Sequence, residues 1–515
     1  GLVGSEMCIR DRMLDTASIA GDIREYINLI ANNSRLTGYP GCNLAALKIA
    51  SFFKSLGLKV LIQNYSVLIP LDEGSTVRVT YPVKLTIRAY SLWPNGIHTC
   101  STPKGGISGK LIYVREGNLE DFDGKDVEGN IVLMDFNSGD NWINAAKLGA
   151  KAVIFIEPER TNRYESLKKF LNVPLNFPRL YISKEDGTRL LKILREHPGG
   201  VSVTVENKLH YRQVKAMNVI GILEAANSSE IMVIMAHYDS WSPVPSLAYG
   251  RDEASSIAIL LRLAKVLSTK KPSRTVWFVA LSGHWQALAG AREFTEEFLF
   301  ENPPQKRIGP MINIDVSSDS KSLAVLYSGH FYRLGTGSTG QIVLTRFSWV
   351  RRKIFMEYLP KLSDIMGVNL LGFIEDGFIT DGWWASIPVP YILDSEPMTM
   401  AGALAFSFRT SRSYRYYWMS PLKDFPQVNY ENLAFQYKMI SYIIDSFLSE
   451  DKWDINWNLI RPQRLSWIHA GAATGGGAGV GYVTLQGKVV EYNLSLIHIS
   501  EPTRPLYISY AVFCL

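Results

Sequence analysis

Three residues that could bind a metal ion stand at the ends of apolar segments. His237 follows the strand-like run IMVIMA, Asp315 ends MINID, and Asp252 precedes the helix-like run ASSIAILLRLAKVL. In an open α/β sheet, functional sites form outside the carboxyl ends of the strands. A histidine and two aspartates from such ends can hold a zinc ion and leave its fourth position to water, as in catalytic zinc sites. The sequence therefore predicts a metal site formed by His237, Asp252 and Asp315.

Two more polar residues accompany this set. Asp239, two residues after His237, could orient the imidazole ring or contact a metal-bound water. His284 follows the strand-like run TVWFVAL. Each of these residues, taken alone, is more simply explained as an ordinary polar loop residue, so the prediction depends on a fold that brings them together.

The elements that would position these residues alternate from about residue 214 onward, which predicts a large α/β domain. Buried strands are expected at 218–223, 231–236, 275–281, 310–316 and 389–393. Helices are expected at 254–267, 286–299, 352–366 and 430–448.

The first two hundred residues have other patterns. A helix that ends at Gly57 is expected within 13–63, and residues 65–100 alternate polar and apolar residues in the manner of β-strands. Residues 105–206 alternate strand-like and helix-like segments, which predicts a small α/β module.

Separate segments, in order along the chain, resemble the zinc aminopeptidase/glutamate carboxypeptidase family (peptidase family M28). They include AHYDSW, RDEASSIAILLRLAKVL, RTVWFVALSGHWQALAGAREF, INID and SPLKDFPQVNYENL. Residues 105–206 resemble the protease-associated (PA) domain that many members carry as an insertion. The resemblance implies an α/β fold, the three-layer α/β/α sandwich of zinc peptidases (phosphorylase/hydrolase-like), with an inserted PA domain of mixed α/β type. It divides the chain into a peptidase-like domain (13–64 plus 214–460) and a β-rich segment with the PA domain (65–213).

The resemblance also implies roles for single residues. His237, Asp252 and Asp315 match the ligands of one zinc ion, with Asp252 as the carboxylate that bridges two metals in the family. Asp239 matches the acid that supports the histidine ligand. All four are present in this chain.

The positions for the second zinc ion depart from the family pattern. Trp285 stands where the family has a glutamate ligand, and Met419 stands where it has a histidine ligand. His284 replaces the glutamate that serves as general base. Tryptophan cannot ligate zinc and a methionine thioether is a poor zinc ligand, so we expect one zinc ion and no second site.

Three functions remain open. In the first, one zinc ion activates water for hydrolysis of a peptide or peptide-like amide, with His284 as general base because imidazole titrates near neutral pH. In the second, the chain is a catalytically inactive binding or receptor-like homologue, as the transferrin receptor is in this family. In the third, the fold performs another acyl-transfer chemistry, as in glutaminyl cyclase, but this chain lacks two of the three ligands used there.

A substrate pocket and its surroundings are less sharply indicated. Asp381 resembles an aspartate near the family's pocket, and Trp383 and Trp384 could form an aromatic wall or core packing. The arginine-rich run 407–418 could bind a substrate carboxylate or form a solvated face. The resemblance implies a peptide substrate, a possible homodimer and an extracellular or cell-surface location.

Composition and the two ends bound the remaining possibilities. The 515 residues carry a net charge of +6 without a long basic block, which gives no support to nucleic-acid binding. No apolar run is long enough for a membrane-spanning helix. Residues 1–12 and 494–515 resemble translated sequencing adapters, so we expect a fragment. Residues 461–493 read as a flexible linker and the start of a further β domain.

Overall fold

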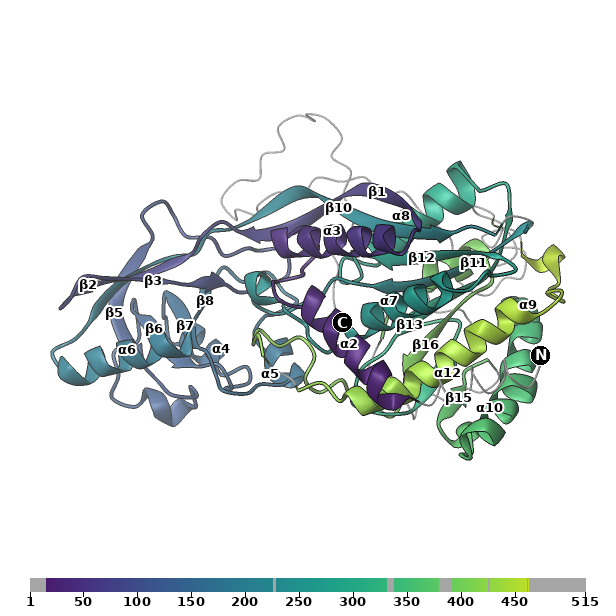
Figure 1. Ribbon diagram of the computed structural model, residues 1–515. Coiled ribbons are helices and arrows are strands. Elements are labelled where there is room, and N and C mark those ends of the chain that lie inside the picture. Colours follow the sequence, from purple (N-terminus) through teal and green to yellow (C-terminus); the bar gives the residue numbers. More distant parts are fainter. Residues whose placement is uncertain are drawn as a thin grey trace.

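The computed structural model describes residues 15–225, 228–330, 338–378, 391–424, 427–460 and 462. Within them the chain forms two eight-stranded sheets. Figure 1 shows the two sheets beside each other, with the long strands β1 and β10 running between them.

The first sheet contains the strands that end at the predicted metal ligands. Its central strands β12, β11, β13 and β16 are parallel, so their carboxyl ends meet at one edge of the sheet. The strands, in spatial order, are β1 (Lys59–Asp72), β10 (Leu209–Leu223), β12 (Thr275–Leu281), β11 (Glu230–His237), β13 (Arg307–Asp315), β16 (Ala405–Thr410), β14 (Leu323–Leu326) and β15 (Ile374–Asp376).

Most of the predicted strands are present. Those expected at 218–223, 231–236, 275–281 and 310–316 are confirmed, because they overlap β10, β11, β12 and β13. Residues 391–393 of the strand expected at 389–393 are not in a strand, and 389 and 390 lie outside the described residues. The strands β14, β15 and β16 are not among the predicted strands.

Helices cover both faces of this sheet, which is therefore the middle of three layers. Alternate residues of a strand point to opposite faces. In β11, Met232 and Ile234 pack in one core cluster, whereas Val233 and Met235 pack in another. The first cluster is covered by α2 (Thr16–Ile30), α3 (Pro40–Ser55), α7 (Ser255–Ser268), α9 (Ser338–Arg352), α10 (Leu359–Met366) and α12 (Tyr430–Ser449), and the second by α8 (Ala289–Thr295) and α11 (Glu396–Ala401).

The predicted α/β/α sandwich is thus confirmed, and so are the long helices. The helices expected at 254–267 and 430–448 correspond to α7 and α12. Those expected at 286–299 and 352–366 each combine an α-helix with a π-helical stretch, at Glu296–Glu301 and Lys353–Tyr358. The helix predicted to end at Gly57 is α3.

The second sheet forms a smaller unit of mixed α/β type, as expected. Its strands β5, β6, β7 and β8 are parallel and β9 and β2 join antiparallel. In spatial order the strands are β3 (Leu85–Arg88), β2 (Thr76–Tyr81), β9 (Ser202–Glu206), β5 (Ile107–Tyr113), β6 (Ile131–Asp135), β7 (Ala152–Ile156), β8 (Arg179–Ile182) and β4 (Tyr90–Ser91). The accompanying helices are α4 (Trp142–Lys147), α5 (Arg163–Leu167) and α6 (Lys184–Glu196).

A long antiparallel ribbon joins the two units. β1 pairs with β10 from Lys59 opposite Ile222 to Asp72 opposite Leu209. The domain boundaries expected near residues 64 and 214 both fall inside this ribbon, so the chain enters and leaves the smaller unit along one continuous pair of strands.

Several predicted features lie outside the described residues. These are the ends at 1–12 and 494–515, nearly all of the segment 461–493, and the pocket residues Asp381, Trp383 and Trp384. Among the described residues, no helix has the length and apolar character needed to cross a membrane.

Candidate metal centre

The three predicted ligands lie together at the carboxyl edge of the first sheet. His237 is the last residue of β11 and Asp315 the last residue of β13, and these two strands are parallel neighbours. Asp252 lies in the loop before α7. All three side chains are buried. The sheet therefore places His237 and Asp315 at one edge, and the chemistry of all three residues depends on the partners of each side chain.

His237 is held by Asp239 through one ring nitrogen. Its Nδ1 lies 3.3 Å from Asp239 Oδ1 and 3.2 Å from the Asp239 main-chain oxygen. The other carboxylate oxygen of Asp239 accepts a hydrogen bond of 2.8 Å from Thr37. Burial opposes ionisation of Asp239, but the hydrogen bond and charge of His237 outweigh it and lower the pKa of the carboxyl group. The Nε2 atom of His237 is buried without a hydrogen-bond partner among the described residues.

His284 stacks on His237 and has its own carboxylate. The two imidazole rings lie 4.1 Å apart at 14°, and His284 Nδ1 lies 2.8 Å from Asp394 Oδ2. Burial lowers the pKa of His284, but the charge and hydrogen bond of Asp394 outweigh it, so that the pKa is raised. This shift favours the protonated imidazole, which cannot accept a proton as a general base does.

Both carboxylate oxygens of Asp252 accept hydrogen bonds from the protein. Oδ1 accepts from the main-chain N–H of Ser318 at 2.8 Å, and Oδ2 accepts from the indole N–H of Trp418 at 2.6 Å. Burial, followed by the nearby charge of Asp319, raises the pKa of Asp252 to about 6. The carboxylate expected to bridge two metals thus faces a tryptophan.

Asp315 is bound by two arginines. Arg409 donates from its NH1 to Oδ2, and Arg415 donates from its NH1 to Oδ1 at 2.7 Å and from its NH2 to the main-chain oxygen at 2.7 Å. Each arginine is only 2% exposed. Burial opposes ionisation of Asp315, but the charges of Arg415 and Arg409 hold its pKa well below the usual range. The carboxylate is therefore ionised and fully paired.

Large apolar side chains occupy the positions that match the second metal site. Trp285 and Met419 are both buried, in one cluster with Trp241 and Trp418. The ring of Trp285 lies 6.2 Å from that of Trp241 and 6.5 Å from that of Trp418. The main-chain N–H of Met419 donates to the buried Glu253 at 3.1 Å, which joins this loop to the segment just before α7.

This arrangement of donors does not fit a zinc ion. A metal ligand must direct a lone pair at the ion, and the carboxylates of Asp252 and Asp315 are instead oriented toward protein donors, with two arginines on Asp315. Within the part of the chain that the structure describes, no group of three or more His, Cys, Asp or Glu side chains is arranged to hold a metal. Of the three predicted ligands, only His237 has a buried side-chain nitrogen or oxygen atom without a hydrogen-bond partner among the described residues.

The sequence reasoning missed the residues that engage the predicted ligands. Arg409 and Arg415 belong to the run 407–418, but they are buried and bind an internal carboxylate instead of solvent or substrate. Arg412 of the same run is exposed and pairs with Glu375. The usable signal was the apolar segment AFSF directly before Arg409, which indicates a buried strand ending at a charged residue.

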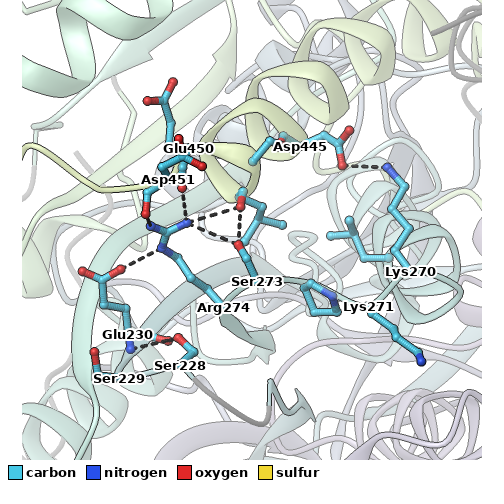
Figure 2. A pocket seen from close by; sticks show the side chains of 14 residues that line it. Ser228, Ser229, Glu230, Lys270, Lys271, Ser273, Arg274, Asp445, Glu450 and Asp451 are labelled. Carbon is cyan, nitrogen blue, oxygen red and sulfur yellow. Dashed lines mark hydrogen bonds and ion pairs between the residues drawn. The ribbon is translucent and has the colours of Figure 1, made fainter. Parts of the chain in front are cut away.

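A cavity of about 470 Å³ lies at the opposite edge of the sheet. It is lined by residues at the amino ends of β11 and β12, Glu230 and Arg274 among them, and by the end of α12. Figure 2 shows the Arg274 guanidinium bonded to Glu230 and to the chain around Glu450. None of the predicted site residues that the structure describes lines this cavity.

Comparisons with known proteins agree with this architecture. Residues 218–346 match Peptidase family M28, and residues 107–190 match the PA domain. The predicted resemblance is confirmed: one segment of the chain is similar to Peptidase family M28 and another to the PA domain.

Individual relatives are more distant. The chain is 26% identical over 416 residues to Aminopeptidase NAALADL1 of Mus musculus, covering 61% of this chain and 53% of the relative. It is 26% identical over 295 residues to Aminopeptidase YwaD of Bacillus subtilis (strain 168), covering 56% and 59%. A solved structure of BSAP, a zinc aminopeptidase from Bacillus subtilis, aligns at a TM-score of 0.48 and 18% identity, covering 86% of this chain and 98% of that one. The chain thus spans between half and three fifths of the length of these two curated relatives.

Proposed function

We propose that this protein is a non-hydrolytic member of the M28 peptidase class that binds peptides or polypeptide segments without cleaving them. The observation that carries the proposal is the environment of Asp252. Both of its carboxylate oxygens accept hydrogen bonds, one of them from the Trp418 indole at 2.6 Å. Asp252, which matches the carboxylate shared by two metals, is thereby oriented toward donors of the protein itself.

The neighbouring positions support the same conclusion. Trp285 and Met419 replace two metal ligands with side chains that ligate zinc poorly or not at all. His284, at the position of the general base, is paired with Asp394 and its pKa is raised. Hydrolysis of an amide needs an activated water and a group that accepts its proton, and the raised pKa of His284 disfavours the neutral imidazole that would accept it.

A peptide is the ligand class that the relatives support. Two of them are named as aminopeptidases, and residues 218–346 match Peptidase family M28. Because the chain spans little more than half of their length, the ligand of the whole protein is part of the proposal.

A second candidate function is peptide hydrolysis with a single zinc ion. It is favoured by His237, whose Nε2 is unpartnered while Nδ1 is held by Asp239. A bound zinc ion would polarise the scissile carbonyl and acidify water. In this function Asp315 would have to release Arg409 and Arg415.

Metal content and product formation distinguish the two functions. The full chain is dialysed against excess zinc, freed of unbound metal and analysed for zinc, then incubated with peptides that have free or blocked termini. We expect substoichiometric zinc and no cleavage product by mass spectrometry. One equivalent of zinc that is lost in His237→Ala, together with amino-acid release, would establish the hydrolase instead, and two equivalents would contradict the assignment of Trp285 and Met419.

The binding half of the proposal has its own test. The same peptide mixture is passed over the immobilised chain and over a blank support, and the retained peptides are identified by mass spectrometry. We expect selective retention of intact peptides. If the chain retains none beyond the blank, it does not bind peptides.

A further inference from the structure

We infer that Arg409 and Arg415 act as a built-in cation that neutralises Asp315 in place of a metal ion. This inference rests on the proposed non-hydrolytic function and extends it, because it states what replaced the metal. Two guanidinium groups carry a formal charge of +2, the same as one zinc ion. They reach both oxygens of a carboxylate that is itself inaccessible to solvent.

Strand pairing places the first arginine. β13 and β16 are parallel neighbours, and Asp315 lies opposite Arg409 in their register. Arg409 donates to Asp315 Oδ2, and its guanidinium also lies 4.8 Å from the ring centre of Tyr391. A position next to Asp315 on the adjacent strand gives Arg409 a short and direct reach to the carboxylate.

The loop after β16 places the second arginine. Arg415 has a left-handed backbone with φ of 46°, and Arg412 and Met419 of the same loop also have positive φ. Such conformations are unfavourable for these residues and persist only where surrounding contacts hold them. Here Arg415 binds both the side chain and the main chain of Asp315, and its guanidinium lies 3.9 Å from the ring centre of Trp418.

Charge balance explains why the pair is needed. Asp315 is fully buried, and so are Asp239 and Asp394 in the same part of the molecule. A buried carboxylate without a compensating cation is strongly destabilising. In a metal-binding relative the ion supplies that charge, whereas here the chain supplies it from residues 94 and 100 positions further along.

The pair can be tested by a double-mutant cycle on the full chain, measured as the midpoint of thermal unfolding. Arg415→Met leaves Asp315 with one arginine, and we expect a loss of about 5 °C or more. Arg409→Met/Arg415→Met leaves the buried carboxylate without a cation, and Asp315→Asn in that background removes this unpaired charge at constant volume, so we expect it to recover a large part of the loss that the two arginine changes cause. Arg412→Met is the matched control, because Arg412 is an exposed arginine of the same loop, and its midpoint is expected to stay within about 1 °C of wild type.

Zinc provides a second measurement on the same proteins. We expect neither added zinc nor a chelator to move the midpoint of the wild type or of Arg412→Met. In the double variant Arg409→Met/Arg415→Met, Asp315 becomes a free carboxylate beside His237, and we expect zinc to raise the midpoint. The additional change His237→Ala is expected to abolish that rise.

Each failure has a distinct meaning. If Arg415→Met behaves like Arg412→Met, or if Asp315→Asn recovers nothing, the arginines do not neutralise Asp315 and the inference is wrong, while the proposed function stands. Should Arg409→Met/Arg415→Met fail to fold, the comparison is with the triple variant that adds Asp315→Asn, and a triple variant that also fails to fold overturns the inference. Stabilisation of the wild type by zinc would overturn both proposals.

Discussion

At the residue scale, function in this molecule depends on which partner each buried polar group has. Asp252 and Asp315 have the residue type and position of metal ligands, but their lone pairs are directed at Trp418, Ser318 and two arginines. A residue of the right type at a ligand position is therefore not evidence of a metal site until its partners are known.

The hydrogen bond between Trp418 and Asp252 can be tested by removing its donor. Trp418→Phe keeps an aromatic ring but leaves Asp252 Oδ2 without its indole partner, and an unsatisfied buried acceptor costs about 1–3 kcal/mol. We expect that loss in the free energy of unfolding measured with urea. Tyr414→Phe, an exposed change in the same loop, should change stability by less than about 0.5 kcal/mol. Equal effects of the two changes would show that the indole hydrogen bond does not stabilise the fold.

Lys169 of the PA unit is a second residue with a measurable electrostatic role. Its ammonium group is inaccessible to solvent and donates to the Gly139 carbonyl at 2.6 Å and to Glu165 at 3.2 Å. Burial lowers the pKa of Lys169 from 10.5 to about 8, although Glu165 opposes the shift. Between these two values the unfolded chain keeps a proton that the folded chain has released, so the contribution of Lys169 to stability rises with pH.

We therefore expect the free energy of unfolding of the wild type to rise relative to Lys169→Met between pH 8 and pH 9.5. The relative rise is at most about 2 kcal/mol, and urea unfolding at each pH measures it. Lys168→Met is the control, because the Lys168 ammonium is solvent-accessible and pairs with Asp140. If the free energy of unfolding of Lys169→Met changes with pH as that of the wild type does, burial does not lower the pKa of Lys169.

At the scale of elements, the two edges of the first sheet differ in what they contact. The carboxyl edge carries the candidate site, and the amino edge is fastened to the end of α12. Arg274, just before β12, pairs with Glu230 at 2.7 Å and donates to the main-chain oxygens of Leu448, Glu450 and Asp451 (Figure 2). One side chain thus satisfies the carbonyl groups that a helix leaves unpaired at its end.

Replacing Arg274 tests this fastening. Arg274→Leu leaves Glu230 and several carbonyl groups without a donor, so we expect a loss of about 3–5 kcal/mol in the free energy of unfolding. Lys270→Met is the control, because its pair with Asp445 is partly exposed and such pairs contribute about 0–1 kcal/mol. Hydrogen exchange should show the last turn of α12 opening first in Arg274→Leu. Protection there equal to that of the control would contradict the role of Arg274.

At the scale of the whole molecule, an aromatic chain connects the candidate site to the PA unit. From Trp285 the ring contacts continue to Trp241, which lies 5.3 Å from Trp93 and 5.6 Å from Phe170. Main-chain hydrogen bonds add to this contact, from Trp93 to Pro243 and from Arg163 to Tyr416. Trp285, which stands where the family resemblance implies a metal ligand, therefore helps to hold the two units together.

Trp241→Ala should weaken the coupling between the two units. We expect a loss of about 3–5 kcal/mol and, in calorimetry, two unfolding transitions where the wild type has one. Trp277→Leu is the matched control, since Trp277 packs on Phe294 and Phe298 inside the peptidase unit. That change is expected to lower the midpoint but to keep a single transition. A single transition in Trp241→Ala would show that the aromatic chain does not couple the units.

The sequence by itself determined the resemblance to the M28 family and the strands that bear His237 and Asp315. It also predicted the departures from the family pattern at Trp285 and Met419. These are local properties: a strand's period, a residue at its end, and a motif of adjacent residues can all be read without knowing the fold.

Only the tertiary structure decided what the retained ligands bind. Arg409 and Arg415 reach Asp315 because β16 pairs beside β13 and because the following loop turns through left-handed residues. No period or local spacing encodes such a meeting, since it depends on strand order and on contacts between segments about a hundred residues apart. A carboxylate can bind a zinc ion or an arginine, and the fold places two arginines beside Asp315.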